Sequence, residues 1–155
     1  MLERRRTTVG LVTQFLDVVP RVGAADLVVQ AGCSAEEARR LLYRVGLPGD
    51  LHDGPPATFS GGQRQLLNLA RALARPRPLL LLDEATAPLD PSRRHAVMRT
   101  LEEKKHAGTA LLAVFHDVPT AAGVVDRVVT MRDGRIAARA GSRCVRRDSV
   151  QRVAS

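Results

Sequence analysis

The 155-residue sequence is poor in the residue types that build disulfide frameworks, zinc sites and nucleic-acid stacking surfaces. Its two cysteines, Cys33 and Cys144, lie far apart and without metal-ligand spacing, so neither a disulfide framework nor a zinc site is expected. Aromatic residues make up 3%, which argues against a surface that stacks single-stranded bases. No apolar run approaches the roughly 20 residues that cross a bilayer, and no signal peptide is recognisable. We therefore expect a soluble, cytoplasmic chain without direct membrane insertion.

Lysine is also scarce, because it occurs only at positions 104 and 105. Arginine supplies the rest of the positive charge, and the net charge is +8. A basic balance of this kind is compatible with nucleic-acid binding. The lack of aromatic residues favours a solvated basic surface instead, so we expect no nucleic-acid partner. Hydrophobic residues make up 45%, enough for one globular domain with a core.

The most informative stretch runs from Thr58 to Asp90 and begins with a Ser-Gly-Gly-Gln turn. Ser60 suits a helix N-cap, because its hydroxyl can accept a hydrogen bond from an amide two or three residues later. Gly61 and Gly62 leave the first helical amides open to a close-approaching group. Open amides at the positive end of a helix dipole favour phosphate, although such a turn on its own is more often an ordinary turn.

A predicted helix follows the turn and ends at Pro76, and a run of four leucines then leads to Asp83 and Glu84. The run Leu79 to Leu82 is typical of a strand buried on both faces of a parallel sheet. Its carboxyl end is where open α/β sheets bind ligands, so the two carboxylates suit Mg²⁺ and a general base. The alternative is a strand end that simply exits into solvent.

Other predicted elements flank this stretch on both sides. A Ser34 to Glu37 capping box begins one helix, and Asp90-Pro91 is a favoured helix entry. Asp133-Gly134 is a strong hairpin signal. We expect helices at 24–30, 34–45 and 91–106, a β-rich segment at 7–14, a second fully buried strand at 109–115, and hairpin strands at 128–132 and 135–139.

The motifs FSGGQ, LLLLDE and APLD follow one another in residues 59–90, and together they are far more specific than any one alone. On these residues the sequence resembles the ATP-binding subunit of ABC-type ATPases, with a signature motif, a Walker B strand and a D-loop. The resemblance implies an α/β fold, the C-terminal part of a P-loop NTPase with a mostly parallel sheet and a helical subdomain. It implies one partial domain over residues 1–155: a helical subdomain at 24–75, a core with the C-terminal hairpin at 76–140, and a basic tail at 141–155.

The same resemblance implies the roles of individual residues, the cofactors ATP and Mg²⁺, and a second ABC subunit, identical or different, as dimer partner. Gln14 matches the Q-loop glutamine, which approaches Mg²⁺ and the attacking water. Asp83 matches the Mg²⁺ partner, Glu84 the general base, and His116 the histidine that contacts the γ-phosphate. The implied nucleotide-binding residues are Ser60, Gly61, Gly62, Gln63, Asp83 and Asp90.

Within the family the sequence looks most similar to the ATP-binding subunit of the phosphonate carbon–phosphorus lyase system. The segments that carry this resemblance are VTQFLDVVPRV at 12–22, PPATFSGGQ at 55–63, VFHD at 114–117, and Asn68. It implies a role in alkylphosphonate degradation, with lyase-complex subunits as further partners. Two alternatives stay open: an ABC transporter ATP-binding subunit, and a partner or remnant that keeps the signature surface without hydrolysing ATP. DNA-repair ATPases share the signature but carry long coiled coils or zinc motifs, which this sequence does not show.

One family motif is missing from these 155 residues. A phosphate-binding P-loop needs Gly-x₄-Gly-Lys-Ser/Thr, and neither Lys104 nor Lys105 follows a glycine. Gln14 lies near the start, although the Q-loop normally follows the P-loop by some tens of residues. We therefore expect the C-terminal part of a longer ATPase, without independent ATPase activity, whether the gene is truncated, split or assigned a wrong start.

Overall fold

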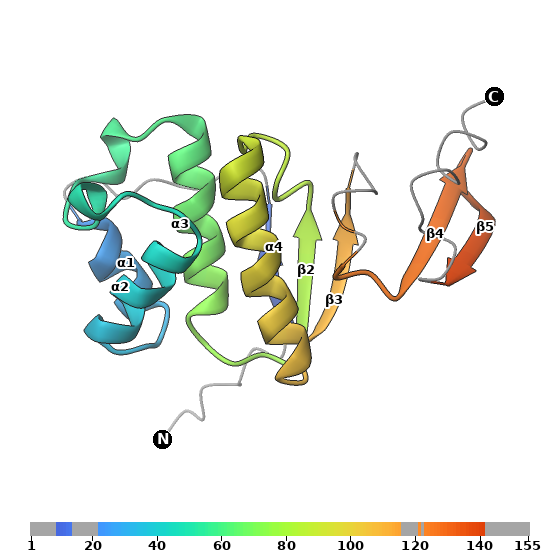
Figure 1. Ribbon diagram of the computed structural model, residues 1–155, viewed down its shortest axis with the longest axis horizontal. Coiled ribbons are helices and arrows are strands. Elements are labelled where there is room, and N and C mark those ends of the chain that lie inside the picture. Colours follow the sequence, from blue (N-terminus) through green and yellow to red (C-terminus); the bar gives the residue numbers. More distant parts are fainter. Residues whose placement is uncertain (1–8, 14–21, 116–120, 122, 142–155) are drawn as a thin grey trace, which may run out of the picture. The chain divides into compact units, whose positions relative to one another are not determined.

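The computed structural model describes residues 9–13, 22–115, 121 and 123–141. These residues belong to two compact units, Met1–Val114 and Phe115–Ser155, and each is described by itself (Figure 1). Gln14, His116 and nearly all of the basic tail lie outside the described residues, so their predicted roles stay predictions.

The first unit is built on three parallel strands in the order β1-β2-β3. They are β1 (Val9–Val12), β2 (Leu79–Asp83) and β3 (Ala110–Val114). In the register of the sheet, Leu11 pairs with Leu81, which pairs with Leu112. Helical segments connect consecutive strands, as parallel pairing requires. The predicted α/β class with a parallel sheet is confirmed.

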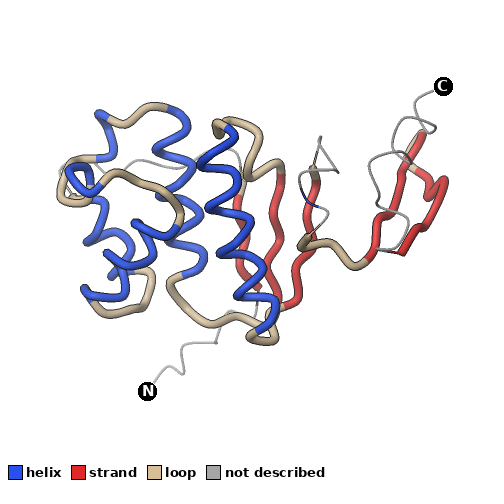
Figure 2. Tube along the Cα trace, viewed as in Figure 1, coloured by secondary structure: helices blue, strands red, loops and turns tan. Residues whose placement is uncertain are grey.

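The helices of this unit lie on one side of the sheet (Figure 2). Helices α3 (Gly61–Leu73) and α4 (Pro91–His106) lie next to the strands, and α1 (Ala24–Gln30) and α2 (Ala35–Arg44) pack on α3. Two short 3₁₀ turns, η1 (Gly49–Leu51) and η2 (Pro56–Thr58), lead into α3. The core between α3 and its neighbours is almost entirely aliphatic; its fully buried side chains include Leu27, Leu42, Leu47, Leu66, Leu67, Leu69 and Leu73.

Helices α2 and α4 begin directly after the capping residues that the sequence predicted. Ser34 caps α2, and its Oγ accepts a hydrogen bond from the Glu37 amide at 3.2 Å, which is one half of the predicted capping box. Asp90 caps α4 in the same way, and Pro91 occupies the first turn. Both helices therefore begin where their side chains satisfy an amide that the helix itself cannot.

The prediction of strands buried on both faces is wrong for β2 and β3. In β2, Leu80 and Leu82 are buried, whereas Leu79 and Leu81 are only half-buried. In β3 no residue is fully buried, and Leu112 is 66% exposed. The physical reason is that the described helices cover only one face of the sheet.

The second unit contains an antiparallel hairpin of β4 (Arg127–Arg132) and β5 (Arg135–Gly141). Asp133 and Gly134 form its turn with φ values of 49° and 72°. Two successive positive φ values match the turn type that suits the twist of a hairpin. The predicted hairpin and its turn residues are confirmed.

Candidate functional site

The Ser-Gly-Gly-Gln turn forms the N-terminus of α3. The Ser60 Oγ accepts a hydrogen bond from the Gln63 amide at 3.3 Å, and the Gln63 Oε1 accepts one from the Ser60 amide at 2.8 Å. This reciprocal pair is a complete capping box. The predicted N-cap at Ser60 is confirmed, and the Gln63 side chain is engaged in holding the turn.

Gly61 and Gly62 occupy the first turn with different surroundings. No heavy atom lies within 4 Å of the place where a Gly61 side chain would begin, so this position is open. At Gly62 the same point lies 3.2 Å from the backbone oxygen of Pro88. The first turn of α3 is therefore pressed against the loop 84–89 on one side and open on the other. Its amides and dipole favour a negatively charged group at the open side.

The loop 84–89 begins at the carboxyl end of β2. Asp83 is exposed there, and Glu84, which is half-buried, has a φ of 48°. The Glu84 amide donates to the Val114 carbonyl at 3.2 Å, and the Glu84 carbonyl accepts from the Ala87 amide at 3.0 Å. A glutamate in the left-handed region is uncommon and costs on the order of 1–2 kcal/mol, so the surrounding contacts impose this conformation. No sequence pattern indicated this conformation, because glycine is the residue that such a turn normally carries.

Two side-chain amides of α3 contact the carboxyl ends of the neighbouring strands, and the sequence did not reveal either contact. The Gln65 Nε2 donates to the Ala85 carbonyl at 3.1 Å, just after β2. The Asn68 Nδ2 donates to the Thr13 carbonyl at 2.9 Å, just after β1. The capped turn, the end of β2 and the end of β1 are thus joined in one arrangement.

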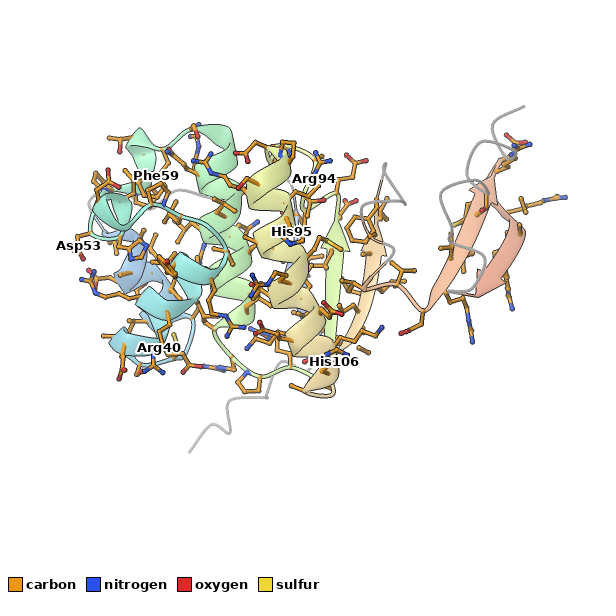
Figure 3. All side chains as sticks on the ribbon, viewed as in Figure 1. Arg40, Asp53, Phe59, Arg94, His95 and His106 are labelled. Atoms are coloured by element: carbon orange, nitrogen blue, oxygen red, sulfur yellow. The ribbon has the colours of Figure 1, made fainter. Side chains whose placement is uncertain are left out.

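Helix α4 holds the far end of the loop. The Arg94 Nη2 donates to the Leu89 carbonyl at 3.1 Å, and Arg94 lies at the end of α4 next to the loop, whereas His106 lies at the opposite end (Figure 3). The Asp90 Oδ1 accepts from the Arg93 amide at 3.0 Å, and its Oδ2 pairs with the Arg93 Nη1 at 3.3 Å. Asp90 therefore serves α4 as a cap, and its predicted contact with nucleotide stays a prediction.

The carboxylates at the end of β2 suit a partial Mg²⁺ site. Within the described ranges no three His, Cys, Asp or Glu residues gather as metal ligands. Mg²⁺ is usually held by one or two carboxylates together with substrate phosphates and water, and the exposed Asp83 can supply one such carboxylate. The donor set therefore fits Mg²⁺ brought in with a phosphate ligand.

Cys33 lies outside this site, in the turn between α1 and α2. Its Sγ approaches the Val28 carbonyl at 3.5 Å. Burial raises the pKa of this thiol above its ordinary value, and the Glu37 carboxylate raises it further. Cys33 is therefore a weakly reactive thiol at neutral pH.

Comparison with known families matches residues 1–87 to the family described as ABC transporter. The chain belongs to this family. The ABC resemblance of the signature and Walker B motifs is thereby confirmed at the level of the ATP-binding family.

Among the described residues, no helix has the length and hydrophobicity that a membrane crossing requires.

Curated relatives of this ABC chain include export and import proteins. It is 39% identical over 140 residues to the macrolide export ATP-binding/permease protein MacB of Chromobacterium violaceum, covering 85% of this chain and 21% of that protein. It is 49% identical over 84 residues to the hemin import ATP-binding protein HmuV of Streptomyces coelicolor, covering 54% and 30%. It is 35% identical over 141 residues to the glutamine transport ATP-binding protein GlnQ of Escherichia coli, covering 85% and 58%. The chain thus spans less than two thirds of each of these relatives.

Solved structures show the same fold. The chain superposes with a TM-score of 0.75 on a dimeric post-hydrolysis state of the ATP-binding cassette MJ0796 bound to ADP and Pi, with 25% identity, covering 89% of this chain and 64% of that one. A second dimeric structure of MJ0796, a bacterial ABC transporter cassette, gives a TM-score of 0.76. The predicted fold class, an ABC ATPase within the P-loop NTPases, is confirmed.

Proposed function

We propose that this chain belongs to the ATP-binding subunit of an ABC transporter and supplies the signature side of a nucleotide site between two subunits. The observation that carries the proposal is the capped, open turn at Ser60–Gly61–Gly62, held against the loop that follows Asp83 and Glu84. The names of the relatives, which include macrolide export, hemin import and glutamine transport proteins, support transport as the output.

The proposed roles follow from charge and position. The amides of Gly61 and Gly62 and the α3 dipole stabilise negative charge on the γ-phosphate of ATP held by the partner subunit, an interaction that strengthens when water is excluded. At the chain's own strand ends, Glu84 orients or deprotonates a water and Asp83 binds Mg²⁺, which neutralises phosphate charge when present. Gln14 is proposed to approach the attacking water, and His116 is proposed to contact the γ-phosphate. Both roles rest on the family resemblance alone.

A second candidate is the ATP-binding subunit of the phosphonate carbon–phosphorus lyase system. It rests on the sequence resemblance of the segments at 12–22 and 55–63 and of Asn68 alone. The export and import relatives favour the transporter instead. Affinity capture of the chain from its own cells separates the two, because a transporter subunit should retain membrane permease subunits and a lyase subunit should retain phosphonate-degrading enzymes.

The signature role is tested by complementation between subunits. The chain is mixed with a P-loop-competent ABC subunit whose own signature serine is replaced, and ATP turnover is measured. We expect turnover to return on mixing and to disappear when the chain carries Ser60→Arg, because the arginine fills the open side of the turn. A mixture that stays inactive at saturating concentrations of a folded chain contradicts the proposal.

A matched control is available in α2. Ser34 is also an exposed N-cap whose Oγ accepts an amide hydrogen bond, but it caps a helix outside the candidate site. Ser34→Arg therefore costs a comparable cap and adds the same charge, and turnover should survive it. If both substitutions abolish turnover equally, the loss reflects folding or charge and not the signature turn.

A further inference from the structure

Gln65 and Asn68 contact two different strands from one helix. They lie three residues apart on α3, so they project from the same side of the helix about 5–6 Å apart. Their acceptors follow β1 and β2, which are neighbouring parallel strands with Val12 paired to Leu82. Neighbouring strands lie about 4.8 Å apart, so the helix spacing matches the strand spacing.

These amides are not what packing alone would select. Gln65 is only 2% exposed, and it lies among fully buried leucines on α3. Its acceptor belongs to Ala85, which is completely buried, so water cannot replace the donor. A buried carboxamide is unfavourable unless it is hydrogen-bonded, and a buried carbonyl that loses its donor is equally unfavourable. The polar residue at this position therefore serves the contact and not the core.

The two acceptors lie beside the proposed reaction groups. The Thr13 carbonyl directly precedes Gln14, and Ala85 directly follows Glu84. The helix that carries the amide pair, Gln65 and Asn68, also carries the turn Ser60–Gly62 at its N-terminus. Through one rigid helix, the pair links this turn to both strand ends.

We propose that Gln65 and Asn68 are positioning residues, which fix the N-terminal turn of α3 relative to the carboxyl ends of β1 and β2. Their bearing on ATP turnover rests on the proposed function, whereas the positioning itself does not. Without the pair, α3 still packs on β1 and Gly62 still lies against Pro88, but the turn is held less tightly relative to the strand ends and its place in the site between subunits is less fixed.

The positioning is tested by amide hydrogen exchange on the full chain, at a concentration where light scattering shows a monomer. Gln65→Leu should speed exchange of the Ala87 and Leu89 amides, which bond within the loop 84–89, about tenfold relative to the Ala38 amide of α2, which bonds to the Ser34 carbonyl. Tenfold corresponds to about 1.4 kcal/mol. Asn68→Leu should have the same local effect at the Val12–Leu82 end of the β1–β2 pairing.

The control is Thr100→Val on α4. Thr100 is 2% exposed, and its Oγ1 donates to the Ala96 carbonyl of α4 at 3.0 Å and lies 3.4 Å from the Arg44 carbonyl at the end of α2, away from both strand ends. This substitution also removes a buried side-chain hydrogen bond but should leave exchange at both strand ends unchanged relative to Ala38. Acceleration that is uniform over all core amides, or equal in the control, overturns the proposal. Should Gln65→Leu fail to fold, Asn68→Asp at a half-buried position keeps the volume, removes the donor and decides the same question.

The second readout is turnover in the subunit mixture. Asn68→Asp should lower kcat about tenfold with KM for ATP unchanged, whereas Thr100→Val should change neither. If the mixture with Asn68→Asp turns over ATP as fast as the wild-type mixture, the positioning role is contradicted and the proposed function stays intact. If even the wild-type chain restores no turnover, the proposed function fails, and the exchange experiment still decides whether the amide pair fixes the turn.

Discussion

The two faces of the β1–β2–β3 sheet carry similar apolar side chains but have different surroundings. On the face toward the helices, Val12, Leu80 and Leu82 are at most 3% exposed. On the opposite face, Leu11 is 60% exposed and Leu112 is 66% exposed, although both belong to the same paired row as Leu81. Strands that are apolar on both faces are typical of parallel sheets with a layer on each side.

This difference shows that apolar composition does not by itself establish burial. The helix-covered face stabilises the fold, because each leucine there is removed from water at about 25 cal/mol per Å² of apolar area. The exposed face contributes little to stability and presents a contiguous apolar surface of the kind that associates with other apolar surfaces. The predictions below separate these two contributions.

The largest effect is expected from Leu82→Ala on the covered face. Removing this buried side chain should lower the free energy of unfolding by about 2–5 kcal/mol, through lost burial and a residual cavity. The matched substitution on the other face, Leu112→Ala, should change the free energy of unfolding by no more than about 0.5 kcal/mol. Urea denaturation of both variants measures the difference. Equal losses would mean that the exposed face is covered in solution.

A smaller loss is expected from Gly10→Ala, also on the covered face. A side chain at position 10 would begin 2.5 Å from the Leu80 Cδ2 and 2.7 Å from the Arg77 Cδ, so both neighbours must move. Overpacking of this kind costs about 1–3 kcal/mol. Gly49→Ala is the control, because no heavy atom lies within 4 Å there. If thermal melting shows no difference between the two variants, the covered face is looser than its contacts indicate.

Glu84 directly follows β2, and its φ of 48° is expected to lower the stability of the fold. Glu84→Gly should stabilise the fold by up to about 1 kcal/mol relative to Glu84→Ala, since both remove the carboxylate and only glycine relieves the backbone. Denaturation midpoints compare the two. Both variants should lose turnover in a complete subunit by roughly 10²- to 10⁴-fold, the usual contribution of a general base. A glycine variant less stable than the alanine variant would show that the backbone there is unstrained.

The smallest effect on stability is expected from replacing the exposed leucines. The same replacement should reduce self-association of the chain. Leu11→Thr combined with Leu112→Thr introduces β-branched residues, which favour strands, and should shift the unfolding free energy by less than about 1 kcal/mol. Concentration-dependent light scattering should fall, because the apolar surface has been removed. Unchanged scattering would place the self-association elsewhere, for example on the hairpin residues Val129, Met131 and Ile136, which are also exposed.

The sequence by itself determined the elements and the family. Caps at Ser34, Ser60 and Asp90 set where helices begin, and the turn residues Asp133 and Gly134 set the hairpin, because each depends on interactions within a few residues. The ordered motifs FSGGQ, LLLLDE and APLD predicted the ABC fold, whereas the choice between lyase and transporter depended on segments too short to decide it.

Only the tertiary structure decided which face of the sheet is covered, which backbone conformation Glu84 adopts, and which carbonyls the side-chain amides of Gln65 and Asn68 contact. The Asn68–Thr13 hydrogen bond spans 55 residues, and the Gln65–Ala85 bond spans 20. In the sequence, Asn68 stood out only as one of the residues that carry the lyase resemblance, and no local pattern indicated the carbonyl that it meets. That carbonyl is brought to it by the pairing of β1 with β2 and by the packing of α3 against β1, and neither is encoded in the helix alone.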